Sequence, residues 1–258
     1  MNHLTIWRYL TTEKFEQLIN DKGIYFSKAS DFEDKREGYY TQDKYFENLR
    51  RNESDEDTLN AINSAEEMSN RIRDRSPSHN YISCWHKNNN ENINMWNDYI
   101  KNADEGVVIK SNDIKIIWMI PHSLSEVITH YDCIYGDKNN NNDFTDNFKY
   151  KDQKFHSENE FRLVIDNFTL NVLTPFSGGL ESIPCIGGER SYKDLGNGKD
   201  PKNDIYKKGN GFVVKYDLNK IIDEIRTHPK SSDKYFRHIK EKMKEAGLAC
   251  PLNQSELK

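Results

Sequence analysis

The sequence predicts an α+β protein with a mixed, mainly antiparallel sheet of short strands, surrounded by helices and carrying a polar helical insertion. Short runs in which apolar and polar residues alternate recur along the chain, as half-buried strands require. The helical patterns are gathered around these strands and do not alternate regularly with them, and no internal repeat is visible. We therefore expect one domain over residues 1–258.

Composition narrows the classes of protein that this chain can represent. Hydrophobic residues make up 35% of the 258 residues, charged residues 31% and aromatic residues 12%, so Tyr, Phe and Trp must supply much of the core. The formal net charge of −5 argues against a generally basic nucleic-acid binder.

Cysteine spacing and apolar run length favour a soluble, cytoplasmic protein. The cysteines at positions 84, 133, 185 and 250 form no C-x-x-C pair, which is typical of reduced thiols and not of a disulfide framework. The longest apolar run, residues 114–121, is too short to span a bilayer, and no signal-peptide pattern opens the sequence. We expect no membrane association.

The first thirty residues predict a strand, a helix and a second strand. Residues 5–10 alternate as a strand, residues 13–19 carry an apolar helical face after a Thr-Thr cap, and residues 24–27 form the next strand. Arg8 lies on the first strand. Tyr25 and Ser27 share one face of the second.

The middle of the chain predicts an insertion followed by further sheet. Residues 41–80 are strongly polar with apolar residues at helical spacing, so we expect a helical insertion that ends at the Ser-Pro-Ser of 76–78. Strands are then predicted at 81–86, 106–109 and 127–135, and a helix at 93–101.

The stretch from residue 154 to 165 carries the most distinctive charge pattern. Interpreted as one strand, it places His156, Glu158, Glu160 and Arg162 on a single face. Two carboxylates flanked by cations can form an acid, a base or an electrostatic clamp. The alternative is a solvated strand face whose charges pair off, and such pairs contribute little.

The C-terminal part predicts a long irregular loop and a closing α+β segment. Residues 187–211 are rich in Gly, Asn and Lys, which indicates a loop. We then expect a strand at 212–216, a helix at 218–225, a short extended run at 226–228 and a final helix at 234–246.

Three kinds of chemistry remain open, and the first is a phosphate-binding turn at Gly187-Gly188, although a Gly-Gly pair is more often an ordinary turn. No phosphate-loop, dinucleotide-binding, zinc-protease or serine-hydrolase motif is present in the sequence. A metal site would have to combine His86, His130, His156 and Glu158, without any short-range ligand spacing, so we predict no metal ligands.

The third arrangement joins the first two strands to the charged stretch. Arg8 would hold a pyrophosphate or carboxylate, Tyr25 or Tyr99 would stack on a flat ring, and Ser27 would hydrogen-bond the ligand. Glu160 would stabilise a cationic sugar-like transition state, with Glu158 as base or orienting group. Each residue taken singly also has an ordinary structural role.

Several motifs together resemble a known family. They are Trp7-Arg8-Tyr9, the runs at 24–27, 31–34, 82–85 and 106–109, Met95-Trp96-x-x-Tyr99, and the Glu158-x-Glu160-x-Arg162 pattern. This set, which spans nearly the whole chain, is similar to the bacterial and phage family catalogued as domain of unknown function 2971. The family's Trp and Tyr before the first Glu are replaced here by Phe155 and Ser157.

The order of elements more distantly resembles the ADP-ribosyltransferase fold. In that fold a first-strand Arg or His, a second-strand Ser or Tyr and a late-strand Glu surround NAD. The resemblance implies Arg8, Tyr25 or Ser27, and Glu160 in those roles, with Glu158 completing the Glu-x-Glu pair as a second catalytic residue. We expect Trp96, Tyr99 and Arg162 to join the binding residues.

The leading hypothesis is therefore an enzyme that transfers ADP-ribose from NAD to a macromolecular acceptor, a nucleic acid or a protein, in phage–host conflict. A metal-dependent or nucleic-acid-processing defence effector is the second hypothesis. The third is a non-enzymatic module that binds a nucleotide-like small molecule or a partner. A closed, aromatic-lined pocket around Arg8, Tyr25 and Glu160 would favour the enzyme, and a flat face would favour the module.

Overall fold

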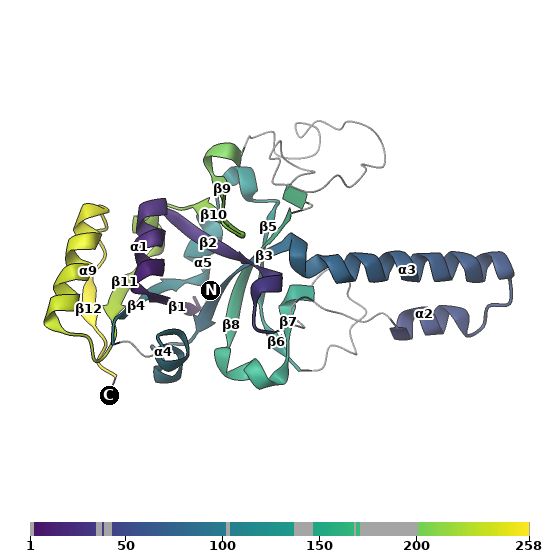
Figure 1. Cartoon of the computed structure of the whole chain (residues 1–258), viewed down its shortest axis with the longest axis horizontal. Coiled ribbons are helices and arrows are strands. Elements are labelled where there is room, and N and C mark those ends of the chain that lie inside the picture. Colours follow the sequence, from purple (N-terminus) through teal and green to yellow (C-terminus); the bar gives the residue numbers. More distant parts are fainter. Residues whose placement is uncertain are drawn as a thin grey trace.

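The computed structural model describes residues 3–34, 38, 43–101, 104–136, 147–167, 169–170 and 201–257. In this part of the chain the architecture is α+β, as predicted, with a sheet at the centre and helices around it (Figure 1). None of the helices in these ranges has the length and apolar composition needed to cross a membrane.

The central sheet of the described residues follows the order β12-β11-β4-β1-β3-β2-β10-β9, while β8 also pairs with β3 and β5 pairs with β8. Neighbouring strands are antiparallel except for β11 and β12. The strands are β1 (Thr5–Thr11), β2 (Gly23–Lys28), β3 (Asn80–Lys87), β4 (Gly106–Asn112), β5 (Ile128–Asp132), β8 (Glu160–Asp166), β9 (Ile205–Lys208), β10 (Gly211–Lys215), β11 (Glu224–Thr227) and β12 (Leu252–Gln254). A separate parallel pair joins β6 (Ile134–Tyr135) to β7 (Tyr150–Lys151).

Helices lie around the sheet, and two of them extend far from it. The helices are α1 (Thr12–Asp21), α2 (Asp43–Arg50), α3 (Glu56–His79), α4 (Ile93–Tyr99), α5 (Asp113–Trp118), α8 (Leu218–Ile221) and α9 (Asp233–Glu245). Short 3₁₀ helices are η1 (Ala29–Asp31), η2 (His122–Leu124), η4 (Asn147–Lys149), η5 (Gln153–Glu158) and η6 (Pro201–Asn203). Helices α2 and α3 form a long antiparallel arm that projects away from the sheet (Figure 1).

Helix α1 shows how the first elements follow from local sequence. The Thr11 side chain accepts from the N–H of Lys14 and caps the helix, and Phe15, Leu18 and Ile19 bury its apolar face. The helix ends at Asp21, and the left-handed backbone of Lys22 (φ 50°) turns the chain into β2.

Strand β3 changes partners along one of its edges. One edge of β3 pairs with β8 from Asn80 to His86. The second edge has two partners, because β2 pairs there with Tyr81 and Ile82, whereas β1 pairs with His86 and Lys87. Strands β1 and β2 therefore diverge beside residues 83–85, and we call this opening the fork.

The core is divided between the two faces of the sheet. The larger cluster packs under α1, α5 and α9 and includes Phe15, Phe26, Trp85, Leu163 and Phe212. On the opposite face α4 covers a smaller aromatic cluster of Trp7, Tyr9, Met95, Trp96, Ile100 and Val108. Strand β1 contributes side chains to both clusters and β2 to the larger one, so packing fixes the two strands that form the fork.

The structure corrects three boundary predictions. The strand expected over 154–165 begins only at Glu160, because residues Gln153–Glu158 form η5 and Asn159 turns the chain in a left-handed conformation (φ 37°). Helix α3 does not stop at the Ser-Pro-Ser of 76–78 but continues through Pro77 to His79. The helix expected over 218–225 ends at Ile221.

The prediction of a loop over 187–211 is wrong for residues 201–211. Residues 187–200 lie outside the described residues. Residues Pro201–Asn203 form η6, and Ile205–Lys208 form β9, which pairs with β10. The Lys-rich composition concealed this strand, because β9 is a short edge strand and only Ile205 is fully buried.

Candidate functional site

A cavity of about 490 Å³ opens at the fork, and we call it the fork cavity. Its volume lies in the range that small-molecule sites occupy. Strands β1, β2, β3 and β8 and helices α1 and α4 all contribute to its walls. Aromatic side chains are prominent among the lining residues, which include Trp7, Tyr9, Tyr25, Phe32, Trp85 and Tyr99.

The fork cavity brings together five of the eight residues singled out from the sequence, namely Arg8, Tyr25, Ser27, Tyr99 and Glu160. They come from β1, β2, α4 and β8, which are far apart in the chain. This arrangement is a pocket with aromatic walls and not a flat face.

Arg8 closes the gap between the diverging strands. Its guanidinium donates to the Ser83 hydroxyl (2.7 Å) and to the Tyr25 carbonyl (2.9 Å), and lies 5.5 Å from the centroid of the Trp85 ring. Burial lowers the pKa of Arg8, but the group remains charged at neutral pH. Among the described residues Arg8 forms no ion pair, so its charge faces the cavity without a carboxylate.

Glu160 lies at the base of the cavity in a network of buried charges. Its Oε2 accepts from Arg162 Nε (2.7 Å) and its Oε1 accepts from Lys151 Nζ (3.3 Å). The side chains of these three residues are between 0 and 5% exposed. Burial would raise the pKa of Glu160, but Arg162 and Lys151 outweigh it and hold the pKa below its usual value.

Glu158 reaches the same lysine from a different element. Its Oε2 accepts from Lys151 Nζ at 2.5 Å, and 22% of its side chain is exposed. Burial and the nearby Glu160 carboxylate raise the pKa of Glu158, in part because the protonated Glu158 can donate a hydrogen bond to Glu160. The two carboxylates therefore interact with each other, although they do not share a strand face.

Three predicted binding or catalytic residues do not line the cavity. Trp96 lies on the buried face of α4 and donates its indole N–H to Glu91 (3.0 Å), so it is a core residue. Arg162 is also fully buried and donates to the Phe148 carbonyl (2.8 Å) as well as to Glu160, so it positions Glu160. Glu158 contacts the network from outside the cavity wall.

Sequence reasoning missed Lys151 and Gly211. Lys151 approaches Glu160 only because β7 pairs with β6, a contact that no local pattern indicates. Gly211 leaves room for a neighbouring ring, since a Cβ there would lie 2.4 Å from the Tyr25 hydroxyl and 2.3 Å from the Phe26 carbonyl oxygen. A glycine inside a strand pattern is a signal for such a close approach.

The residues of the metal hypothesis are separated in space. His86 lines the fork cavity, whereas His130 lines a second hollow and His156 packs against the Tyr135 ring at a centroid distance of 5.2 Å. In the described ranges, no group of three or more His, Cys, Asp or Glu side chains is arranged to hold a metal ion.

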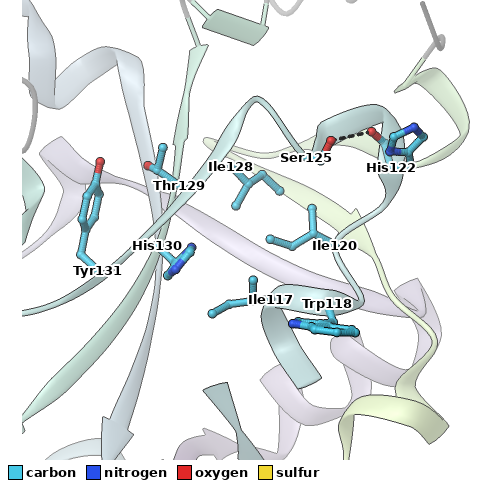
Figure 2. Close-up of a pocket in the computed structure, with 9 residues that line it drawn as sticks. All are labelled: Ile117, Trp118, Ile120, His122, Ser125, Ile128, Thr129, His130 and Tyr131. Atoms are coloured by element: carbon cyan, nitrogen blue, oxygen red, sulfur yellow. Dashed lines mark hydrogen bonds between the residues drawn. The ribbon is translucent and has the colours of Figure 1, made fainter. Parts of the chain in front are cut away.

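The second hollow lies between the end of α5 and strand β5 (Figure 2). It measures about 670 Å³, and its apolar wall comes from Ile117, Ile120 and Ile128, with Trp118 78% exposed at its margin. Among the residues that the structure describes, no carboxylate or basic Lys or Arg side chain lines it. It therefore lacks the charged groups that distinguish the fork cavity.

Tyr99 links the cation and the carboxylate of the fork cavity electrostatically. Burial of its hydroxyl and the negative charge of Glu160 raise the pKa of Tyr99, and Arg8 opposes the shift. The hydroxyl therefore stays protonated at neutral pH and is able to donate a hydrogen bond.

Comparison of the chain with family models, with curated proteins and with solved structures finds no match.

Proposed function

We propose that the fork cavity binds NAD and that the protein transfers ADP-ribose from it to a macromolecular acceptor, a nucleic acid or a protein. The observation that supports this proposal most directly is that Arg8, Tyr25, Ser27, Tyr99 and Glu160 line one aromatic-walled cavity. A pocket of this kind offers a cation, flat rings and a carboxylate within one enclosure. A dinucleotide has a matching group for each of them, namely a pyrophosphate for the cation, flat bases for the rings and ribose hydroxyls for the carboxylate.

Each group has a defined part in the proposed reaction. Arg8 attracts the pyrophosphate, because its charge has no carboxylate partner among the described residues and only two of its five N–H donors are used in the contacts given above. The rings of Tyr25 and Tyr99 stack on the base or the nicotinamide. Glu160 stabilises the positive charge that develops on the ribose as the glycosidic bond to nicotinamide breaks.

Membership of the bacterial and phage family catalogued as domain of unknown function 2971, a role in phage–host conflict and a cytoplasmic location belong to the same proposal. The location rests on the cysteine spacing and the short apolar runs, and the first two rest on the sequence motifs described above. Tyr25, Ser27 and Tyr99 from those motifs line the cavity. The acceptor is the part of the proposal that a screen of nucleic acids and proteins from an infected host would identify.

Binding and turnover of NAD test the proposal. We expect NAD to raise the melting temperature of the protein and to bind in calorimetry, and nicotinamide to be released in the presence of acceptor. Glu160→Gln should reduce nicotinamide release about 100-fold or more, the usual scale for removing a charge that stabilises a transition state. Glu224→Gln is the matched control, because Glu224 forms a partly buried ion pair with Arg226 outside the cavity. Absence of NAD binding to the wild-type protein would refute the proposal.

A ligand-binding module is the second candidate function, and one observation favours it. Both oxygens of Glu160 already contact cations, so the carboxylate can be a structural ion-pair partner at the base of a binding pocket. In that case NAD or a related nucleotide binds with the same dependence on Arg8, but no nicotinamide is released and Glu160→Gln changes stability alone.

A further inference from the structure

The buried imidazole of His86 has a property that the proposed function does not use. His86 lies in β3, directly opposite Glu160 of β8 in the antiparallel ladder, and its ring lines the fork cavity. Cross-strand partners point to the same face of a sheet, so the imidazole and the carboxylate are neighbours at the base of the cavity. Only 4% of His86 is exposed.

Hydrogen bonding fixes the tautomer of this imidazole. His86 Nδ1 lies 2.6 Å from the carbonyl oxygen of Glu158, and a carbonyl oxygen only accepts, so Nδ1 carries the proton. In the neutral ring Nε2 then has a lone pair. This atom is buried and has no hydrogen-bond partner among the described residues, which is rare for a buried polar atom.

The surroundings keep the ring neutral. Burial lowers the pKa of His86, and the bond to Glu158 and the charge of Glu160 oppose the shift only in part. Tyr9 of β1 also packs against the ring, at a centroid distance of 6.4 Å. A neutral imidazole with a fixed tautomer and an unused lone pair is the form in which histidine accepts a proton.

We propose that His86 is the general base of the transfer reaction, which takes the proton from the attacking hydroxyl group through Nε2. This inference rests on the proposed function and adds the class of acceptor group, an O–H. The acceptor oxygen forms a bond to C1′ of the ribose as the bond from C1′ to the nicotinamide nitrogen breaks. The bond electrons leave with nicotinamide, which departs neutral, and the proton of the hydroxyl moves to Nε2. Water in place of the acceptor gives hydrolysis by the same step.

The test uses the full chain with NAD and with water as the acceptor. His86→Asn retains an N–H donor near the Glu158 carbonyl but removes the Nε2 lone pair, and His228→Asn is the matched control. His228 is also a buried histidine with a lowered pKa, and it lies outside the fork cavity. We expect His86→Asn to lower nicotinamide release about 100-fold or more, as for loss of a general base, while the Kd for NAD stays within about threefold.

The pH profile separates a base from a merely structural residue. In the wild-type protein, nicotinamide release should fall as pH decreases through the titration of one group, and this limb should be missing from the residual activity of His86→Asn. Nitrogen NMR of the imidazole should show a protonated Nδ1 and an unprotonated Nε2 at pH 7.

Each outcome decides a different statement. If the wild-type protein neither binds nor cleaves NAD, the proposed function fails and the role of His86 in it fails too. If the wild-type protein cleaves NAD but His86→Asn cleaves it equally well with the same pH profile, only the role of His86 is refuted. A proton on Nε2 at pH 7 would also refute it.

Discussion

Replacing Arg162 with Met tests whether Glu160 is held by buried ion pairs. Arg162 has no exposed side-chain surface, Glu160 is 2% exposed, and their contact is 2.7 Å. The substitution removes this contact and also the donor to the Phe148 carbonyl (2.8 Å). Of the two cations that contact it among the described residues, Glu160 would keep Lys151 at 3.3 Å. Removing one partner of a buried ion pair costs about 3–5 kcal/mol, because the remaining charge stays out of water.

That loss converts into a measurable change in melting temperature. For a chain of this size about 1 kcal/mol corresponds to roughly 2–4 °C, so Arg162→Met should lower the melting temperature by roughly 6–20 °C. Urea unfolding would give the free energy directly. Adding Glu160→Gln to Arg162→Met should recover part of the loss, because the orphaned carboxylate is then neutral. Arg50→Met is the control, since its ion pair with Glu66 is 31% exposed on the arginine side and 24% on the glutamate side and should cost less.

Two results would contradict a buried ion pair between Arg162 and Glu160. If Arg162→Met lost less than about 1 kcal/mol, Glu160 would have access to water or to another partner, and the burial argument would be wrong. If the two substitutions were additive, the residues would not interact in the way that their distance indicates. The same network implies that Glu160→Gln lowers the melting temperature, so turnover of that variant has to be compared at a temperature where it is folded.

Three further predictions concern the surroundings of the cavity. Because folding raises the pKa of Glu158, the folded state binds more protons than the unfolded state, and the free energy of unfolding should fall as pH rises above about 5. Glu158→Gln should flatten this dependence, which urea unfolding between pH 5 and 8 would measure. The lowered pKa of Glu160 acts in the opposite sense and only at lower pH, where stability is lost as pH falls. Trp96→Phe should cost about 1–3 kcal/mol through the lost bond to Glu91 yet leave the Kd for NAD within about twofold, and a large change in Kd would contradict the placement of Trp96 in the core. Gly211→Ala should cost about 1–3 kcal/mol and weaken NAD binding, because its Cβ would meet the Phe26 carbonyl and the Tyr25 hydroxyl; unchanged stability would show that β10 can move.

The elements that sequence predicts well are those whose pattern is complete within a few residues. Strand β1, helix α1 and strand β2 were predictable because alternation, a Thr cap and a helical apolar face all lie in a continuous stretch. Their placement also carried Arg8, Tyr25 and Ser27 to the fork. The fork itself was not predictable, because it depends on β3 exchanging one partner strand for another.

The charged stretch shows where local pattern fails. Alternation assigned Glu158 and Glu160 to one strand face, but alternation is equally satisfied by a 3₁₀ turn followed by a strand. Only the left-handed Asn159 separates the two cases, and Asn is among the residues that adopt that conformation most readily. Lys151, which joins the two carboxylates, is brought in by pairing between β6 and β7 and could not be inferred from the charge pattern.

The two ion pairs of Glu160 are unequal, and this inequality bears on the choice between an enzyme and a binding module. Oε2 is held by the fully buried Arg162 at 2.7 Å, whereas Oε1 is held by Lys151 at 3.3 Å, and Lys151 has a closer partner in Glu158 at 2.5 Å. A ligand hydroxyl that donates to Glu160 would therefore bind at Oε1, where it displaces only the weaker contact with Lys151, and Lys151 keeps its contact with Glu158. Deprotonation of Glu158 strengthens that alternative contact. On the proposed function, NAD binding should thus tighten as pH rises through the titration of Glu158, and a module that uses Arg8 alone should show no such dependence.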